Sequence, residues 1–205
     1  MTMKQLIKSI IKVILPFYCG YKKCSTSKIH NLTYWKYLYF KLFPGLHKYY
    51  YPIDKTCLIA NPRKVKVGVN SSIARPGCYI QGAGGVYIGK YVQLAPNVGI
   101  LSANHDLYDQ NKYNVAPIKI GDYSWIGMNS VITAGVELGP RTIVAAGAVV
   151  TKSFPDGFCV LAGIPAKKIK DLDSSLFKPW TYEHEYYGFI PKEEFENNSK
   201  KWLDI

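Results

Sequence analysis

An aliphatic residue recurs every six positions from residue 88 to 100 and again from residue 120 to 150, and this spacing constrains the fold more than any other feature of the chain. Gly or Ala directly follows several of these residues. Neither the 3.6-residue period of a helix nor the strict alternation of a strand gives a period of six. The recurring residues are Ile88, Leu94, Ile100, Ile120, Ile126, Ile132, Leu138, Val144 and Val150.

A triangular solenoid with one hexapeptide on each flat side explains this period. Each side is a short strand whose aliphatic residue points inward, and small residues allow the tight corners. Parallel strands of successive coils then bond to each other along the axis. The pairs Val67-Gly68 and Ile73-Ala74 indicate an earlier, less regular coil. Six consecutive matches disfavour a chance period in an ordinary β protein, and we predict a mainly β fold with a parallel β-helix over residues 61–170.

The period breaks once, between Ile100 and Ile120, which lie 20 residues apart. The excess of 14 residues beyond one hexapeptide has to leave the coil as an extruded loop. We place this loop within residues 102–117, whose sequence is SANHDLYDQNKYNVAP. Functional residues concentrate on loops that a rigid scaffold holds in place, so this loop is the first candidate for a site.

The extruded loop contains His105, which alone among the four histidines lies in the repeat region. A neutral imidazole is a suitable general base for removing a proton from a hydroxyl near neutral pH. Asn104, Asp106 and Asp109 flank it, and we expect a carboxylate to orient the ring. A surface histidine that merely bonds to its neighbours is the alternative interpretation of the same residue.

Two further runs carry a family resemblance: IKIGDYSWIGMNSVITAGVELGPRTIVAAGAVVTKSF and VLAGIPAKKIK. They resemble the hexapeptide-repeat acetyltransferases, most closely the galactoside, maltose, xenobiotic and capsular-polysaccharide O-acetyltransferase branch. The resemblance covers residues 65–170. It implies a left-handed β-helix, a homotrimer, and acetyl-CoA bound in clefts between neighbouring solenoids. Ile164 stands where many members have Asn or Val, and we expect no functional cost.

The resemblance also assigns roles to individual residues. It implies that His105 is the catalytic base, with Asn104 and Asp106 in the active-site neighbourhood. It places Trp125 at the border of the acceptor site, although packing at a subunit interface explains this residue equally well. It implies no metal. The positions that match acetyl-CoA contacts in the family are Met128, Ala146, Thr151, Lys152, Lys167 and Lys170.

The resemblance implies acetyl transfer from acetyl-CoA to a sugar hydroxyl, and we favour a surface polysaccharide (capsule or O-antigen) or its precursor as acceptor. Antibiotic or other xenobiotic O-acetylation and N-acetylation of a nucleotide-linked amino sugar are alternatives, as is a non-catalytic scaffold. The γ-type carbonic anhydrases share this solenoid but need three histidine ligands for their metal. A single histidine in the repeat excludes that class.

The front of the chain, residues 1–60, is predicted to be a basic, aromatic-rich helical extension. Residues 1–66 hold thirteen basic side chains and a single acidic one, whereas residues 171–205 form an acidic tail. Isoleucines and lysines on opposite faces of residues 1–18 predict an amphipathic helix that contacts a membrane, the protein itself or a partner. Lys12 interrupts the apolar stretch and argues against a signal peptide. A second helix should end near Pro44-Gly45.

Other features narrow the location and the partners. The five cysteines are an odd number without a CxxC pair, which favours a reducing compartment over a disulfide framework. The basic segment shows no recognisable nucleic-acid-binding fold, so we expect no nucleic-acid partner. The chain contains no apolar run of 18 uncharged residues. We therefore expect a cytoplasmic protein, with a contact of residues 1–18 at the cytoplasmic face of the membrane as an alternative to their packing on the protein.

Overall fold

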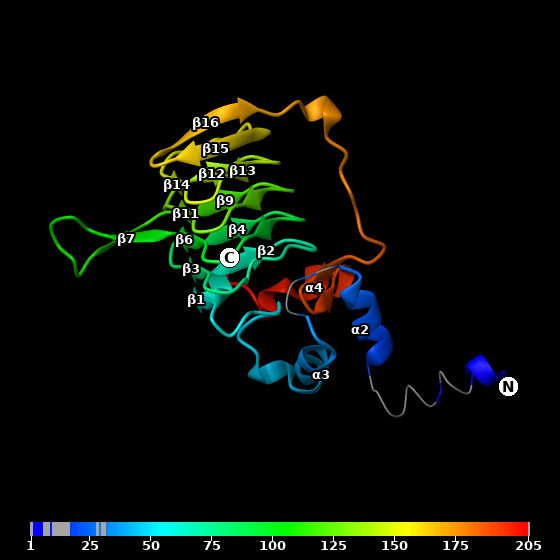
Figure 1. Cartoon of the computed structure of the whole chain (residues 1–205). Coiled ribbons are helices and arrows are strands. Elements are labelled where there is room, and N and C mark those ends of the chain that lie inside the picture. The colour runs from blue at the N-terminus through cyan, green and yellow to red at the C-terminus, as the bar shows by residue number, and fades with distance from the viewer. Residues whose placement is uncertain (1, 6–8, 10–16, 28, 30–31, 205) are drawn as a thin grey trace.

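The computed structural model describes residues 2–5, 9, 17–27, 29 and 32–204. Its body is a parallel β-helix of about five coils, which confirms the predicted fold class (Figure 1). Three sheets form its sides. The first sheet contains β1 (Leu58–Ala60), β3 (Tyr79–Gln81), β6 (Gly99–Leu101), β11 (Val131–Ile132) and β14 (Val149–Val150). The second contains β2 (Val65–Val67), β4 (Val86–Ile88), β9 (Ile118–Ile120) and β12 (Glu137–Leu138). The third contains β5 (Gln93–Leu94), β10 (Trp125–Ile126), β13 (Ile143–Val144), β15 (Cys159–Gly163) and the antiparallel closing strand β16 (Ala166–Asp171).

The predicted six-residue series forms the core of this helix. In the first sheet, Ile80, Ile100, Ile132 and Val150 occupy equivalent positions in successive coils, and each is fully buried. All nine residues of the series are at most 3% exposed. Burying one such side chain stabilises the fold by roughly 1.5–3 kcal/mol, so stacked columns of them hold the coils together. The first strand, β1, lies just before the expected boundary at residue 61.

Corners between the second and third sheets share one backbone conformation. Asn70, Tyr91, Tyr123, Arg141 and Phe158 stand at this corner in five successive coils, with φ between 43° and 58°. Each φ is positive, in the left-handed region that non-glycine residues rarely adopt. This repeated geometry turns the chain sharply and builds a column of side chains along one edge of the solenoid.

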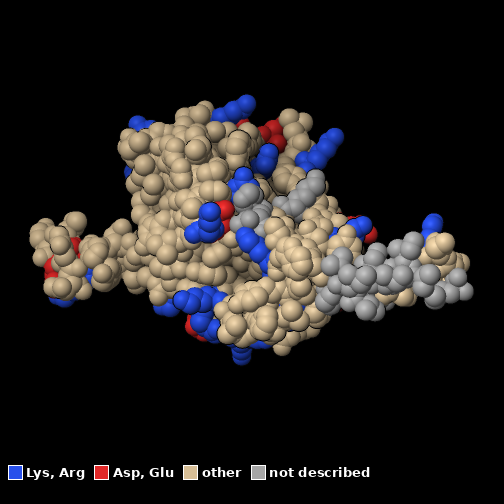
Figure 2. Space-filling view, turned by 60° about the horizontal axis from the view of Figure 1, so that its bottom comes forward, with Lys and Arg blue, Asp and Glu red and all other residues tan. Residues whose placement is uncertain are grey.

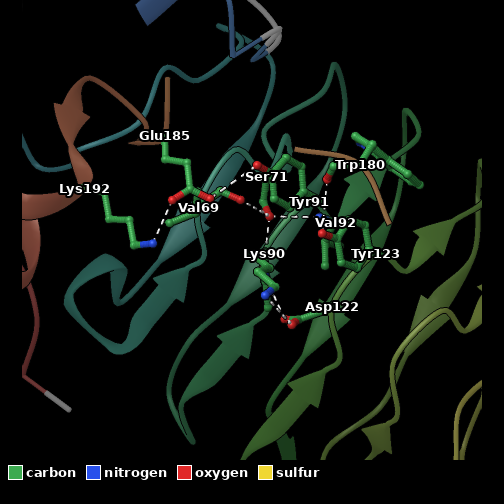
Figure 3. A network of polar contacts seen from close by, with 11 residues as sticks. Val69, Ser71, Lys90, Tyr91, Val92, Asp122, Tyr123, Trp180, Glu185 and Lys192 are labelled. Carbon is green, nitrogen blue, oxygen red and sulfur yellow. Dashed lines mark hydrogen bonds and ion pairs between the residues drawn. The ribbon is translucent and has the colours of Figure 1, made fainter. Parts of the chain in front are cut away.

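The acidic tail covers that edge, a role that its sequence did not indicate. The rings of Tyr91 and Tyr123 stack 5.1 Å apart, and the Trp180 ring lies 4.9 Å from that of Tyr123. Further along, Lys192 donates to the Glu185 carboxylate at 2.7 Å, while the Tyr91 hydroxyl lies 3.4 Å from the same carboxylate (Figure 3). The tail comprises η3 (Ser174–Leu176), β17 (Tyr186–Tyr187), β18 (Ile190–Pro191), α4 (Lys192–Asn198) and η4 (Ser199–Lys201).

The tail returns along the solenoid to the N-terminal helices, which lie at the first coil (Figure 1). There the Phe40 ring lies 4.6 Å from Phe189 and 5.5 Å from Trp202, and the Tyr50 ring lies 4.5 Å from Phe195. Aromatics from both ends of the chain thus form one cap on the solenoid. The helices of the N-terminal part are α2 (Tyr18–Ser25), α3 (Tyr34–Leu42), η1 (Pro44–Leu46) and η2 (Pro62–Lys64).

Helix α3 and its 3-10 continuation confirm the second predicted helix, which was expected to end near Pro44-Gly45. The Thr33 side chain caps α3 by accepting from the Lys36 N–H. The amphipathic helix predicted over residues 1–18 lies mostly outside the described residues. Among the helices that the structure describes, none combines the length and the apolar character that crossing a bilayer would require.

All five cysteines are unpaired, and their environments predict different reactivities. Burial raises the pKa of the Cys24 thiol to about 12 and that of Cys57 to about 12, whereas Cys19 is exposed. Since the thiolate is the reactive form, Cys19 should react first with a thiol reagent in the native protein. A Cys19→Ser variant should lose this fast phase. An equally fast second thiol in that variant would contradict the burial of the other four.

Candidate functional site

The extruded loop predicted within residues 102–117 is a β-hairpin. Strands β7 (Ala103–His105) and β8 (Tyr113–Val115) pair antiparallel and project from the solenoid between β6 and β9 (Figure 1). Ser102 anchors the base of the hairpin, because its buried hydroxyl accepts from the Gly84 N–H at 2.9 Å and donates to the Gln81 carbonyl. The hairpin therefore leaves a rigid coil at a fixed point, as a site on a scaffold requires.

His105 lies at the end of β7 with an exposed ring. Its Nδ1 atom lies 2.8 Å from the backbone carbonyl oxygen of Gln110. A carbonyl oxygen only accepts hydrogen bonds, so Nδ1 carries the proton in the neutral ring and Nε2 keeps its lone pair. The Tyr113 ring packs against the imidazole with 4.4 Å between the ring centres. Both contacts restrict the orientation of the ring.

In this chain a backbone carbonyl, rather than the expected carboxylate, bonds to Nδ1 of this ring. The Asp106 carboxylate accepts from the backbone N–H groups of Tyr108 at 3.0 Å and Asp109 at 3.1 Å, and from the Asn114 amide at 3.2 Å. These bonds, that from Tyr108 foremost, lower the pKa of Asp106. Asp106 therefore shapes the hairpin turn that presents the Gln110 carbonyl. Asn104 directly precedes His105 on β7 and pairs with Asn114 in the strand register.

Three of the other predicted site residues lie together on the third sheet and its next corner. Trp125 belongs to β10 and points outward, and the residue is 53% exposed. Met128 follows at the corner between the third and first sheets, and Ala146 occupies the same corner one coil later. The Gly147 N–H donates to the Met128 carbonyl at 2.8 Å, which holds the two corners in register. Together they form an exposed, mainly apolar edge.

The remaining predicted residues lie nearer the C-terminal end of the solenoid. Thr151 and Lys152 follow β14, at the corner between the first and second sheets. Lys167 and Lys170 lie on β16 opposite Ala162 and Val160. Their neighbour Lys168 pairs with Asp171 at 2.6 Å. Within the described part of the chain, no carboxylate pairs with Lys167 or Lys170, so their charges remain available to a ligand.

Within one chain, two groups of predicted site residues therefore lie apart, at two different corners of the solenoid. The hairpin with His105 leaves from the corner between the first and second sheets, and Thr151-Lys152 share that corner two coils further on. Met128 and Ala146 occupy the corner between the third and first sheets. The first sheet separates the two groups. No three His, Cys, Asp or Glu side chains among the described residues gather as a metal site.

Sequence reasoning missed two contributors to this site. Gln110 acts through its backbone carbonyl, which any residue type supplies, so the sequence held no signal for it. Tyr113 follows from the strand register, which pairs it with His105. Recognising the loop as an antiparallel hairpin would have predicted that Tyr113 lies opposite His105.

Comparison with known proteins identifies the class of this fold. Residues 117–152 match the family model of the bacterial transferase hexapeptide with six repeats. Over 92 residues the chain is 36% identical to a galactoside O-acetyltransferase of Escherichia coli K12, covering 43% of this chain and 45% of that protein. The chain thus spans about half the length of the curated relatives that it matches. These matches confirm the resemblance to hexapeptide-repeat acetyltransferases.

Solved structures agree with this class. A maltose O-acetyltransferase from Clostridium difficile 630 is 28% identical and superposes with a TM-score of 0.53, covering 80% of this chain and 89% of that one. A galactoside acetyltransferase in complex with coenzyme A superposes with a TM-score of 0.59, covering 80% and 86% of the two chains. At 24% identity, the second likeness shows the fold alone.

Proposed function

We propose that this protein is an acetyl-CoA-dependent O-acetyltransferase that acts on a sugar hydroxyl with His105 as general base. The observation that carries the proposal is the bond between His105 Nδ1 and the Gln110 carbonyl, at 2.8 Å. It fixes the tautomer in which Nε2 accepts a proton. The similarity to galactoside and maltose O-acetyltransferases supports acetyl-CoA as donor and a sugar as acceptor.

The reaction then proceeds by direct transfer. His105 Nε2 takes the proton of the acceptor hydroxyl as that oxygen attacks the thioester carbonyl, because a hydroxyl is a poor nucleophile until its proton leaves. The new ester C–O bond forms, the C–S bond breaks, and the imidazolium returns its proton to the departing coenzyme A thiolate. Proton and charge therefore balance over the reaction, and the ring ends neutral.

A covalent acetyl-enzyme intermediate is less well supported by the residues of the solenoid. Such a route needs an activated nucleophile. The Ser102 hydroxyl is buried and bonded to the Gln81 carbonyl and the Gly84 N–H. Cys78 and Cys159 are buried, and burial raises the pKa of both thiols. None of these groups is therefore placed for nucleophilic attack.

A trimer would bring the two separated edges into one site. In a cyclic trimer, the hairpin edge of one copy meets the corner with Met128 and Ala146 of the next. The outer face of the first sheet supports an interface, because Leu58 and Tyr79 are exposed on it. In this arrangement, residues of two copies would complete each acetyl-CoA site.

Light scattering after size-exclusion chromatography should give a mass about three times 23.1 kDa at micromolar concentration. Co-expression of His105→Ala with Met128→Glu, each inactive alone, should restore part of the activity, because some interfaces then hold two intact halves. A monomeric mass, or no complementation from two folded variants, would contradict a site shared between copies.

Lys167 and Lys170 are proposed to attract the phosphates of coenzyme A. Replacing either with Ala should raise the acetyl-CoA KM about fivefold, which corresponds to ~1 kcal/mol for an exposed charged contact. Lys168→Ala is the matched control, since Lys168 already pairs with Asp171 and its loss should leave KM unchanged. With dephospho-acetyl-CoA the effect should shrink if the lysine contacts the 3′-phosphate. An unchanged KM in both variants would remove them from the donor site.

The acceptor that we favour is a hydroxyl of a surface polysaccharide, such as a capsule or O-antigen, or of its precursor. The excess of basic side chains in residues 1–66 supports this choice, because it would keep a cytoplasmic enzyme near the membrane face where such precursors are assembled. Residues 1–18 are proposed to contribute to this contact. A panel of saccharides, antibiotics and nucleotide-linked amino sugars would identify the acceptor by product mass.

A further inference from the structure

Helix α3 is apolar on both of its faces. Tyr37 and Phe40 are buried in the aromatic cap, as a surface helix of a folded protein requires. The opposite face is also apolar but faces solvent, with Trp35 71% exposed and Leu46 of the following 3-10 turn 69% exposed. We name this second surface the α3–η1 face. It consists of Trp35, Tyr39, Leu42, Phe43 and Leu46.

Cationic side chains line a hollow beside this face. Pro44 and Gly45 of η1 form one of its walls, and its volume is about 500 Å³. Its one carboxylate, among the described residues, is that of Asp204, which accepts two bonds of 2.7 Å from the Arg63 guanidinium. The opposite charges of Arg63 and Asp204 therefore cancel each other. The remaining charges come from three lysines that line the hollow, Lys48, Lys64 and Lys201.

Glu194, an acidic side chain of α4, does not cancel these charges. Glu194 lies 3.7 Å from the Lys41 ammonium, so it already has a cation beside it. Figure 2, which brings this end of the molecule forward, shows Lys and Arg side chains around a largely uncharged surface. The α3–η1 face is therefore an apolar surface bordered by positive charge.

This combination favours a lipid surface over a second copy of the chain. Tryptophan and tyrosine suit the boundary between lipid headgroups and acyl chains, where one end of the ring is apolar and the other is hydrated. Lysines near an anionic leaflet each contribute to binding. Two copies that met through this face would instead bring like charges together, which disfavours association. We propose that the α3–η1 face docks the protein on an anionic bilayer.

In this docking, the apolar side chains enter the headgroup region, and Lys48, Lys64 and Lys201 bind lipid phosphates from the adjoining hollow. The proposal is independent of the acetyltransferase activity. It also differs from a contact through residues 1–18, because it depends on a different surface of the protein.

Co-sedimentation of the full chain with vesicles tests the proposal. The protein should bind vesicles of equal parts phosphatidylcholine and phosphatidylglycerol, and binding should weaken with salt and on phosphatidylcholine alone. Leu46→Ser should reduce the partition coefficient about tenfold through lost apolar burial. Lys48→Gln should reduce it about fivefold at low salt. The matched controls are Leu176→Ser, an exposed leucine in η3, and Lys178→Gln, and both should bind as the unaltered protein does.

Unaltered binding by both Leu46→Ser and Lys48→Gln would overturn the proposal, even if the protein bound vesicles through residues 1–18. Failure of the unaltered protein to bind, or equal binding to both vesicle compositions, would overturn it as well. So would an oligomer that dissociates in Leu46→Ser while the protein ignores vesicles, since a second copy would then cover the face. Trp35→Ala gives a second apolar variant if Leu46→Ser fails to fold.

Discussion

Replacing His105 with Ala is expected to lower kcat by about 10²–10⁴-fold, the usual effect of losing a general base. Nε2 of the held imidazole is the atom proposed to take the acceptor proton, and the alanine side chain offers no substitute. The acetyl-CoA KM should change little, because His105 is proposed to act on the acceptor proton, whereas Lys167 and Lys170 are proposed to attract the donor phosphates. Steady-state kinetics with both substrates varied would measure the two effects separately.

His184→Ala is the matched control, since this histidine lies in the tail beside Glu183 and should leave kcat unchanged. Asp106→Ala should lower kcat less than His105→Ala, because Asp106 acts only through the turn that carries Gln110. Near-wild-type kcat in His105→Ala would refute the assignment. An acetylated enzyme trapped with acetyl-CoA alone would refute direct transfer.

Replacing Ile120 with Ala is expected to lower the free energy of unfolding by about 2–5 kcal/mol. Ile120 is 2% exposed and stacks between Ile88 and Leu138 of the neighbouring coils. The smaller side chain would leave a cavity in a column that holds three coils together. Denaturant unfolding followed by circular dichroism would measure the loss.

Lys119 gives the control in the same strand, β9. Its side chain points outward and pairs with Glu137 at 3.2 Å. Lys119→Ala should cost no more than about 1 kcal/mol, because an exposed ion pair contributes little. Similar losses in the two variants would contradict the inward stacking of the six-residue series.

The sequence predicted the solenoid well because one physical constraint repeats in it. An inward residue such as Ile126 or Ile132 must stack on its equivalents in the neighbouring coils. Burial therefore requires an aliphatic residue at every sixth position. The hairpin was found as the single break in that period. No periodic pattern in the sequence predicts the path of the tail, because Trp180 and Phe195 pack against residues that are distant in the chain.

The candidate site was predicted less completely for the same reason. His105 stands out by residue type and by its place in the loop, and the structure adds the contact that sets its tautomer. That contact comes from the Gln110 backbone, which side-chain reasoning does not reveal. The charges of Lys167, Lys168 and Lys170 are equivalent in the sequence, and the pairing of Lys168 with Asp171 distinguishes them.

Transfer of a labelled acetyl group tests the central proposal most directly. The protein would be incubated with acetyl-CoA carrying a ¹³C-labelled acetyl group and each member of the acceptor panel, and products would be detected by mass spectrometry. We predict a labelled acetyl ester on a saccharide, with free coenzyme A released in equal amount and both products formed about 10²–10⁴-fold more slowly by His105→Ala. The proposal would be contradicted if the protein neither bound acetyl-CoA nor transferred acetyl to any acceptor at donor concentrations up to about 1 mM, the upper end of ordinary KM values.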